Sequence, residues 1–284
     1  MQNNRDVRKP FTIRNNFGET ITGDVLYPET DPHPAVLVIV HSFMAFKNWG
    51  FFPFLGEEFA RRGYITILFN FSRNGVTGHG DRITEFLKFS ENTFSHELQD
   101  LQVVIDRIFE GSIIGEFHPS MKLVLLGHSR GGGISILTAS RDNRVHGLVT
   151  WSSIASFDRW TDHQKNLWRQ KGFLHLSPHN TIGPLKLGVN LLRDIEENSE
   201  THNILHAAQK VVVPWLIIHG VNDLTVPLRE GEMLFHAANS RSTEFVRLPA
   251  AGHLFNAATR TEDNYTTLES VIKITDTWIE KSIY

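Results

Sequence analysis

A serine flanked by glycines, Ser129, has the most specific chemical surroundings of any residue in this sequence. Gly127 and Gly131 complete the pattern G-x-S-x-G around it. An apolar run of strand length, 122–126, precedes the pattern, and small helix-compatible residues, 134–139, follow it. This order predicts a sharp turn from a strand into a helix, which would hold the serine hydroxyl clear of the backbone.

The two glycines suit such a turn because they lack Cβ. A side chain two positions to either side of a strained serine would clash with the backbone. The following helix would point its amide N–H groups at the site, where they would stabilise a negative charge on a substrate oxygen. The pattern alone is weak, because a glycine-rich turn can contain a serine by chance.

A serine nucleophile also needs a general base and a carboxylate that orients the base. His253 lies between the last expected strand and the closing helix, and Asp223 directly follows an expected strand. The order Ser129, Asp223, His253 is the one expected for a triad built on this turn. The alternatives are that Asp223 only caps a turn and that His253 is one of 15 unremarkable histidines. Three other acids are less well placed, on expected helices or in an insertion: Asp100, Asp158 and Asp194.

Composition excludes several other kinds of chemistry. The chain has 284 residues, 40% of them hydrophobic, which suffices for one core and a single domain. There is no cysteine, which excludes disulfides, thiolate–zinc sites and a cysteine nucleophile. No H-E-x-x-H or similarly close ligand spacing occurs, so we expect neither a metal nor another cofactor.

Charge and hydropathy bear on partners and location. The net charge of −3 without a basic stripe favours neither nucleic acid nor an anionic membrane. The N-terminus leads into no apolar segment, and the longest apolar run, 35–40, is too short to span a bilayer. We therefore expect a soluble cytoplasmic protein that acts on a small molecule, with its oligomeric state left open.

Hydrophobic periodicity predicts strands that alternate with helices. A β-hairpin is expected over about 11–27, and 72–90 is expected to be a loop. Further strands are expected at 35–40, 64–71, 122–126, 145–151, 211–219 and 243–248, and helices at 53–62, 94–108, 228–238 and 266–279. This alternation predicts a mostly parallel sheet covered by helices on both faces, with functional sites at the carboxyl ends of the strands.

A long insertion, about 153–210, separates two of these strands and is too long for a simple connection. Its first part, with Phe157, Trp160, Leu167 and Trp168, has a helix-like pattern, and a second such pattern follows a loop expected over 172–184. We interpret the insertion as a partly helical cap over the site. The alternative is a crossover helix with a decorated loop away from the substrate. Trp151, just before the insertion, could line an acyl pocket or pack in the core.

The motifs together resemble those of the α/β-hydrolase superfamily over nearly the whole chain. They are G-H-S-R-G-G at 127–132, G-V-N-D followed by V-P at 220–227, and A-G-H at 251–253. The chain is most similar to small esterases of the cinnamoyl/feruloyl type, to serine-aminopeptidase-like hydrolases and to dienelactone-hydrolase relatives, which usually carry a cysteine nucleophile. The resemblance implies one α/β domain with a mostly parallel central sheet, flanking helices and a cap.

The resemblance also implies an oxyanion hole formed by two backbone N–H groups. One belongs to Arg130, directly after the nucleophile, and the other to Phe43, in a loop that often reads H-G-F in such families. Here the loop reads His41-Ser42-Phe43. Serine does not adopt positive φ as readily as glycine. The path of this loop, and the choice of Phe43 over Ser42 or Met44, therefore stay open.

These residues predict a serine hydrolase that cleaves a small carboxylic ester through an acyl-enzyme. Ser129 would be the nucleophile, His253 the general base and acid, and Asp223 the residue that orients it. The same triad could act on a peptide or thioester or transfer an acyl group, and aromatic residues of the insertion favour an apolar or aromatic substrate group. A non-catalytic binding module would have lost a triad residue, and none is lost.

Overall fold

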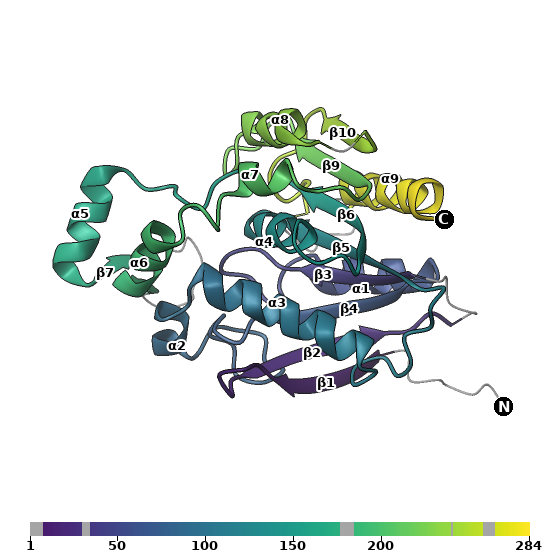
Figure 1. The fold of residues 1–284 in the computed structure, drawn as a ribbon, viewed down its shortest axis with the longest axis horizontal. Helices are drawn as coiled ribbons and strands as arrows, with labels where there is room; N and C mark the ends of the chain where they lie inside the picture. The colour runs from purple at the N-terminus through teal and green to yellow at the C-terminus, as the bar shows by residue number, and fades with distance from the viewer. Residues whose placement is uncertain (1–7, 30–34, 177–184, 240, 258–264) are drawn as a thin grey trace.

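The computed structural model describes residues 8–29, 35–176, 185–239, 241–257 and 265–284. In these residues, eight strands form one sheet in the order β1-β2-β4-β3-β5-β6-β9-β10 (Figure 1). The strands are β1 (Arg8–Arg14), β2 (Thr20–Leu26), β3 (Ala35–Val40), β4 (Ile65–Asn70), β5 (Lys122–His128), β6 (Val145–Trp151), β9 (Trp215–Gly220) and β10 (Thr243–Leu248). From β4 through β10 neighbouring strands pair in parallel, while β2 pairs antiparallel with β1 and with β4. The predicted hairpin and mostly parallel sheet are confirmed.

Helices cover both faces of the sheet, as predicted. They are α1 (Phe52–Arg61), α3 (Phe94–Phe109), α4 (Arg130–Ala139), α8 (Leu228–Ala237) and α9 (Thr266–Ile283). Alternate residues of β3 belong to two different cores, because successive side chains of a strand point to opposite faces. One core includes side chains of α3, α4 and α8, and the other includes side chains of α1 and α9. Burial on both faces explains the uninterrupted apolar runs.

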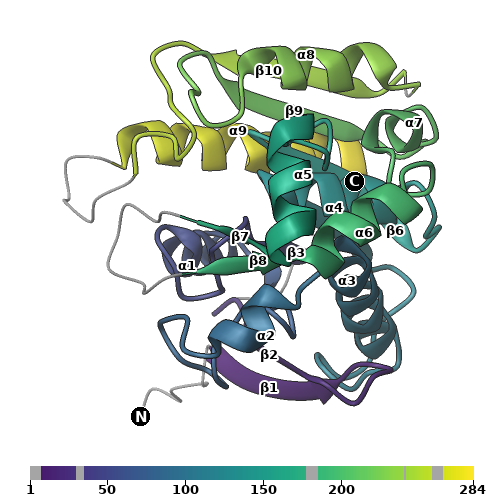
Figure 2. The ribbon, with the colours of Figure 1, turned by 90° about the vertical axis from the view of Figure 1, so that its left-hand side faces the viewer.

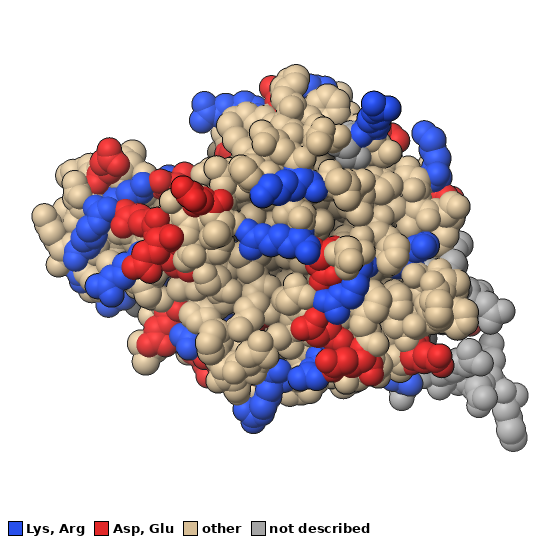
Figure 3. All heavy atoms as spheres, in the orientation of Figure 1, with Lys and Arg blue, Asp and Glu red and all other residues tan. Residues whose placement is uncertain are grey.

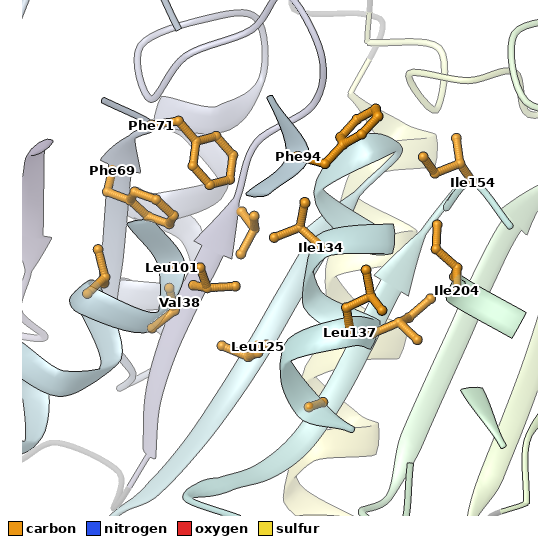
Figure 4. Close-up of a cluster of buried hydrophobic side chains, with 14 of the residues drawn as sticks. Val38, Phe69, Phe71, Phe94, Leu101, Leu125, Ile134, Leu137, Ile154 and Ile204 are labelled. Atoms are coloured by element: carbon orange, nitrogen blue, oxygen red, sulfur yellow. The ribbon is translucent and has the colours of Figure 1, made fainter. Parts of the chain in front are cut away.

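Helix α4, which follows the G-x-S-x-G pattern, is anchored in the first of these cores. Its Ile134 and Leu137 lie among Val38, Leu101 and Leu125, which come from β3, α3 and β5 (Figure 4). All five side chains are completely buried. The residue that joins β5 to α4 is therefore held by a well-packed strand on one side and a well-packed helix on the other.

Three element predictions need correction outside the insertion, of which one is the closing helix α9, which continues to Ile283 rather than ending at 279. The predicted loop over 72–90 ends in a short helix, α2 (Phe86–Ser90), which buries Phe89. Five residues are too few for a helical period to be recognised. Strand β9 begins at Trp215 rather than at 211, directly after Pro214, whose missing N–H cannot extend the ladder.

In the described residues of the insertion, 153–176 and 185–210, five short elements occur. They are α5 (Asp162–Lys171), β7 (Phe173–His175), β8 (Lys186–Gly188), α6 (Val189–Glu197) and α7 (Ile204–Ala208). Helices α5 and α6 project from the body at the left of Figure 1 and face the viewer in Figure 2. Strands β7 and β8 pair antiparallel, so the loop predicted over 172–184 is wrong at 173–175, and residues 177–184 lie outside the described ones.

The first helix of the insertion starts later than the aromatic pattern indicated. Thr161 caps α5 through a capping box with Gln164, and Gly172, at φ 76°, ends it. Phe157 and Trp160 therefore lie in the segment before the helix. Their rings therefore do not belong to a face of α5.

Charged side chains of both signs are interspersed on the face shown in Figure 3. No extended stripe of Lys and Arg is visible on that face. Among the described residues, no helix is both long and apolar enough to cross a membrane.

Candidate active site

Ser129 lies at the carboxyl end of β5, in the turn into α4. Its φ of 57° and ψ of −117° are strained for a residue with a side chain. The neighbouring glycines are sterically required, as predicted. A Cβ on Gly127 would lie 2.4 Å from the carbonyl oxygen of Gly131, and a Cβ on Gly131 would lie 2.2 Å from that of Val40.

The structure brings Ser129, His253 and Asp223 together in one chain of hydrogen bonds. His253 Nε2 is 3.0 Å from Ser129 Oγ, and His253 Nδ1 is 2.7 Å from Asp223 Oδ2. Because an ionised carboxylate can only accept, Nδ1–H donates to Asp223 and Nε2 is left to accept from the serine hydroxyl. His253 is 124 residues from Ser129 and 30 residues from Asp223 in the sequence, so the fold brings the three side chains together.

Asp223 is buried, yet its surroundings favour the ionised form. Burial raises the pKa of this carboxyl, but hydrogen bonds from His253 and from the backbone N–H groups of Val226 and Thr225 outweigh burial and hold the pKa below its usual value. The two backbone groups donate to Asp223 Oδ1 at 2.8 and 2.9 Å. The carboxylate is therefore fixed in position and charged at neutral pH, where it can balance a protonated His253.

The backbone around His253 is held by two further residues that sequence reasoning missed. His128 is completely buried, and burial lowers its pKa to about 3. Its Nε2–H donates to the carbonyl oxygen of His253 at 2.9 Å. Asn256, at φ 62°, donates to the carbonyl of Ala250 at 3.2 Å and accepts from Gly252 N–H at 3.3 Å. The position of His128 next to Ser129 could have indicated a role at the site, but its contact with His253 is visible only in the folded structure.

The two expected oxyanion donors, Phe43 and Arg130, line the same cavity as Ser129. Neither the N–H of Phe43 nor that of Arg130 donates a hydrogen bond within the described part of the chain. The path of this loop, left open by the sequence, has its positive φ at Met44, at 57°, and not at Ser42. The N–H groups of Ser42 and Met44 are also unbonded among these residues, so Phe43 stays a prediction.

A cavity of about 690 Å³ opens beside Ser129 and His253. Its lining is mainly apolar and includes Phe157, Trp160 and Leu176 of the insertion. Trp168 does not line it but is completely buried, with its indole N–H donating to the carbonyl of Leu187. Of the aromatic residues in the insertion's first pattern, Phe157 and Trp160 therefore line the cavity, whereas Trp168 packs in the core.

Trp151 belongs to the core, which settles the alternatives for this residue. It is completely buried, and its indole N–H donates to Thr275 Oγ1 at 3.2 Å. Its ring lies edge-on to that of Phe255, with centroids 5.5 Å apart. It does not line the cavity beside Ser129.

The competing acids serve other contacts. Asp100 accepts from a buried asparagine, and Asp158 pairs with a lysine. Asp194 forms a second serine–histidine–aspartate grouping, but Ser95 Oγ donates directly to Asp194, and His202 Nε2 is 3.5 Å away. With its proton already directed to the carboxylate, this serine has no imidazole base. No group of three or more metal-ligating side chains occurs within the described ranges.

Comparison with known proteins agrees with this geometry. Residues 35–174 match the sequence model of a family described as the alpha/beta hydrolase fold. The chain has the α/β-hydrolase fold. No curated protein sequence matches this chain.

Solved structures share the fold of this chain over nearly its full length. An esterase domain from Rhodothermus marinus is 20% identical, with a TM-score of 0.65 and coverage of 98% of this chain and 99% of the other. Est1E from Butyrivibrio proteoclasticus with bound ferulic acid is 18% identical, with a TM-score of 0.68 and coverage of 96% and 99%. Mouse alpha/beta hydrolase domain-containing protein 10 is 18% identical, with a TM-score of 0.71 and coverage of 96% and 99%.

Proposed function

We propose that this α/β-hydrolase is a serine esterase that cleaves a small carboxylic ester through an acyl-enzyme. The observation that carries the proposal is the hydrogen-bond chain from Asp223 through His253 to Ser129. This chain ends at a cavity of about 690 Å³ with a mainly apolar lining, a size typical of small-molecule sites. The esterases among the structures with the same fold add support.

In the first half of the reaction, Ser129 Oγ attacks the carbonyl carbon of the ester while His253 Nε2 takes the hydroxyl proton. The carbonyl oxygen becomes an oxyanion, which accepts hydrogen bonds from the N–H groups of Phe43 and Arg130. The bond to the alcohol oxygen then breaks, and the proton on His253 passes to the departing alcohol. The acyl group is left as an ester of Ser129.

In the second half, a water molecule attacks the acyl carbon while His253 takes one of its protons. The bond to Ser129 breaks, the proton returns to the serine oxygen, and the carboxylic acid leaves. One ester and one water thus give one acid and one alcohol. Asp223 stays ionised throughout and stabilises the protonated form of His253 in both halves. These steps use only side chains and backbone groups of this chain.

The insertion acts in this proposal as a cap that forms one wall of the acyl pocket. Phe157, Trp160 and Leu176 line the cavity, although each lies far from Ser129 in the sequence. An apolar wall suits the hydrocarbon part of an acyl group and contributes about 25 cal/mol per Å² that it buries. Partners of the enzyme are then small molecules with an ester bond.

Hydrolysis of a substrate panel tests the proposal. The panel contains p-nitrophenyl esters of increasing acyl length, the corresponding p-nitroanilide and a thioester. We expect the esters to be hydrolysed fastest, activity to be abolished in Ser129→Ala, and full activity in Ser270→Ala, which removes an exposed hydroxyl of α9. Preferred cleavage of the anilide or thioester would refute the ester specificity. Full activity of Ser129→Ala would refute the mechanism.

A further inference from the structure

A column of five stacked planar groups lies at the active-site cavity, and four of the five line it. Its members, in spatial order, are Phe157, Phe94, Arg130, Phe43 and Phe89. The rings of Phe157 and Phe94 stack with centroids 3.9 Å apart. The guanidinium carbon of Arg130 lies 4.4 Å from the centroid of Phe94 and 4.8 Å from that of Phe43. The ring of Phe43 stacks in turn on that of Phe89 at 5.9 Å.

Each member comes from a different part of the chain. Phe157 belongs to the insertion, Phe94 to α3, and Phe89 to α2, while Phe43 follows β3 and Arg130 follows the nucleophile. All except Phe89 line the cavity. Arg130 occupies the centre of the column and is its only charged member. A planar guanidinium can stack on aromatic rings on both sides, which a lysine ammonium cannot.

The guanidinium of Arg130 is oriented by a buried carboxylate. Arg130 Nε donates to Glu97 Oε2 at 2.9 Å, and Asn92 donates to Glu97 Oε1 at 2.7 Å. The side chains of Arg130 and Glu97 are only 8% and 6% exposed. Burial raises the pKa of Glu97, although Arg130 and Asn92 act in the opposite direction. The carboxylate therefore holds the Nε edge of the guanidinium in place beside the rings of Phe94 and Phe43.

Burying the charges of Arg130 and Glu97 lowers the stability of the folded state, because both groups lose their contact with water. Burying two charges requires that nearly all of their hydrogen-bonding groups find partners. Arg130 Nη2 is buried without a hydrogen-bond partner among the described residues. An apolar side chain of similar length would fill the same space without that penalty. Stability alone thus does not account for an arginine at this position.

Arg130 touches the oxyanion site twice. Its backbone N–H is one proposed donor, and its side chain stacks on the ring of Phe43, whose backbone N–H is the other. The loop that holds Phe43 has a strained residue next to it, Met44 at φ 57°, so it needs support from outside. We propose that the Arg130 side chain, oriented by Glu97, is a positioning group that sets the location of the Phe43 N–H relative to the Arg130 N–H. This inference rests on the proposed esterase function.

Kinetics of Arg130→Met test the inference, because methionine keeps the backbone N–H and removes the planar charged group. A donor displaced by a fraction of an ångström to one ångström lowers turnover by about 10- to 100-fold. We expect that fall in kcat for a p-nitrophenyl ester, with KM changed by less than roughly 3-fold. Arg130→Lys should lose nearly as much, and Glu97→Gln less, because glutamine can still accept from Nε.

A matched control is available in Arg144. Its guanidinium carbon lies 5.2 Å from the centroid of Phe109, and it pairs with Asp142, but it does not line the cavity. Arg144→Met removes the same kind of stack and ion pair and should leave kcat unchanged. Phe43→Leu provides a second variant of the contact. Combined with Arg130→Met, it should lower kcat little further, because both changes remove one interaction.

The pH profile separates positioning from damage to the triad. In Arg130→Met the plateau of kcat/KM should fall while the midpoint of the pH profile stays at the wild-type pH. Wild-type kcat in Arg130→Met, with or without a lower melting temperature, would overturn the inference and leave the proposed function intact. A shifted midpoint, or additive losses in the double variant, would overturn it as well. A wild-type protein that neither hydrolyses esters nor reacts with a fluorophosphonate at Ser129 would overturn the proposed function first.

Discussion

Gly131→Ala perturbs the turn that carries Ser129, because Gly131 packs tightly against the backbone at the end of β3. The added Cβ would lie 2.2 Å from the carbonyl oxygen of Val40 and 2.5 Å from that of His41, whereas real Cβ contacts stay beyond 3.0 Å. Both obstructing atoms are backbone at the end of β3, a central strand, so neither can rotate away. The turn and β3 must therefore move apart by about 0.8 Å.

That displacement has two measurable consequences. Overpacking against a rigid backbone costs about 3 kcal/mol, and the better helix propensity of alanine returns at most about 1 kcal/mol, which leaves about 2 kcal/mol. For a chain of this size the melting temperature should fall by about 4 °C or more. Because the N–H of Arg130 moves with the turn, kcat/KM for p-nitrophenyl butyrate should fall by about 100-fold.

Gly133→Ala, two residues along the same helix, is the matched control. Its Cβ would lie 2.7 Å from Cδ1 of Ile204, the far end of a flexible side chain that can rotate away. We expect a melting temperature and activity close to those of the wild type. Thermal unfolding and ester hydrolysis of both variants decide the matter. Wild-type behaviour of Gly131→Ala, or greater damage in Gly133→Ala, would refute the steric reasoning.

Asp223→Asn should keep the fold but lower kcat/KM for esters by about 10⁴-fold, because the amide favours the wrong tautomer of His253; a loss below tenfold would contradict its role. Trp160→Ala should extend hydrolysis to longer acyl chains at an unchanged melting temperature, whereas Trp151→Ala should lower the free energy of unfolding by about 3–5 kcal/mol. The reverse pattern would contradict the assignment of Trp160 to the cavity and of Trp151 to the core. The pKa of His128, lowered to about 3 in the folded state, means that only the unfolded chain takes up this proton between about pH 6.5 and 3. The free energy of unfolding should thus fall as pH drops through that window, by up to about 1.4 kcal/mol per pH unit from this residue. Urea unfolding at pH 7 and pH 5 should therefore show a smaller loss of unfolding free energy in His128→Gln than in the wild type.

Sequence alone could predict the features that depend on a local pattern or on the order of residues along the chain. Gly127 and Gly131 mark a turn whose tightness follows from backbone geometry. Strands buried on both faces leave uninterrupted apolar runs, and 35–40 and 145–151 were predicted with the bounds that the structure shows. Asp223 and His253 follow strands in a definite chain order, which predicts that both lie at one edge of the sheet.

The features that could not be predicted depend on contacts between distant segments. The stack around Arg130 joins five parts of the chain, and no local pattern marks its members. Trp160 and Trp168 belong to one aromatic pattern, yet one lines the cavity and the other is buried, because α5 begins only at Asp162. The path of the loop after β3 stayed open from the sequence, and the structure places its positive φ at Met44 rather than at Ser42.

Labelling with a fluorophosphonate probe, followed by mass mapping of the modified peptide, tests the central claim most directly. Such a probe reports an activated serine without knowledge of the natural substrate. The account predicts a single adduct on Ser129 that is lost in Ser129→Ala and retained in Ser270→Ala. A folded wild-type protein that remains unlabelled, or an adduct on Ser95 instead, would contradict it.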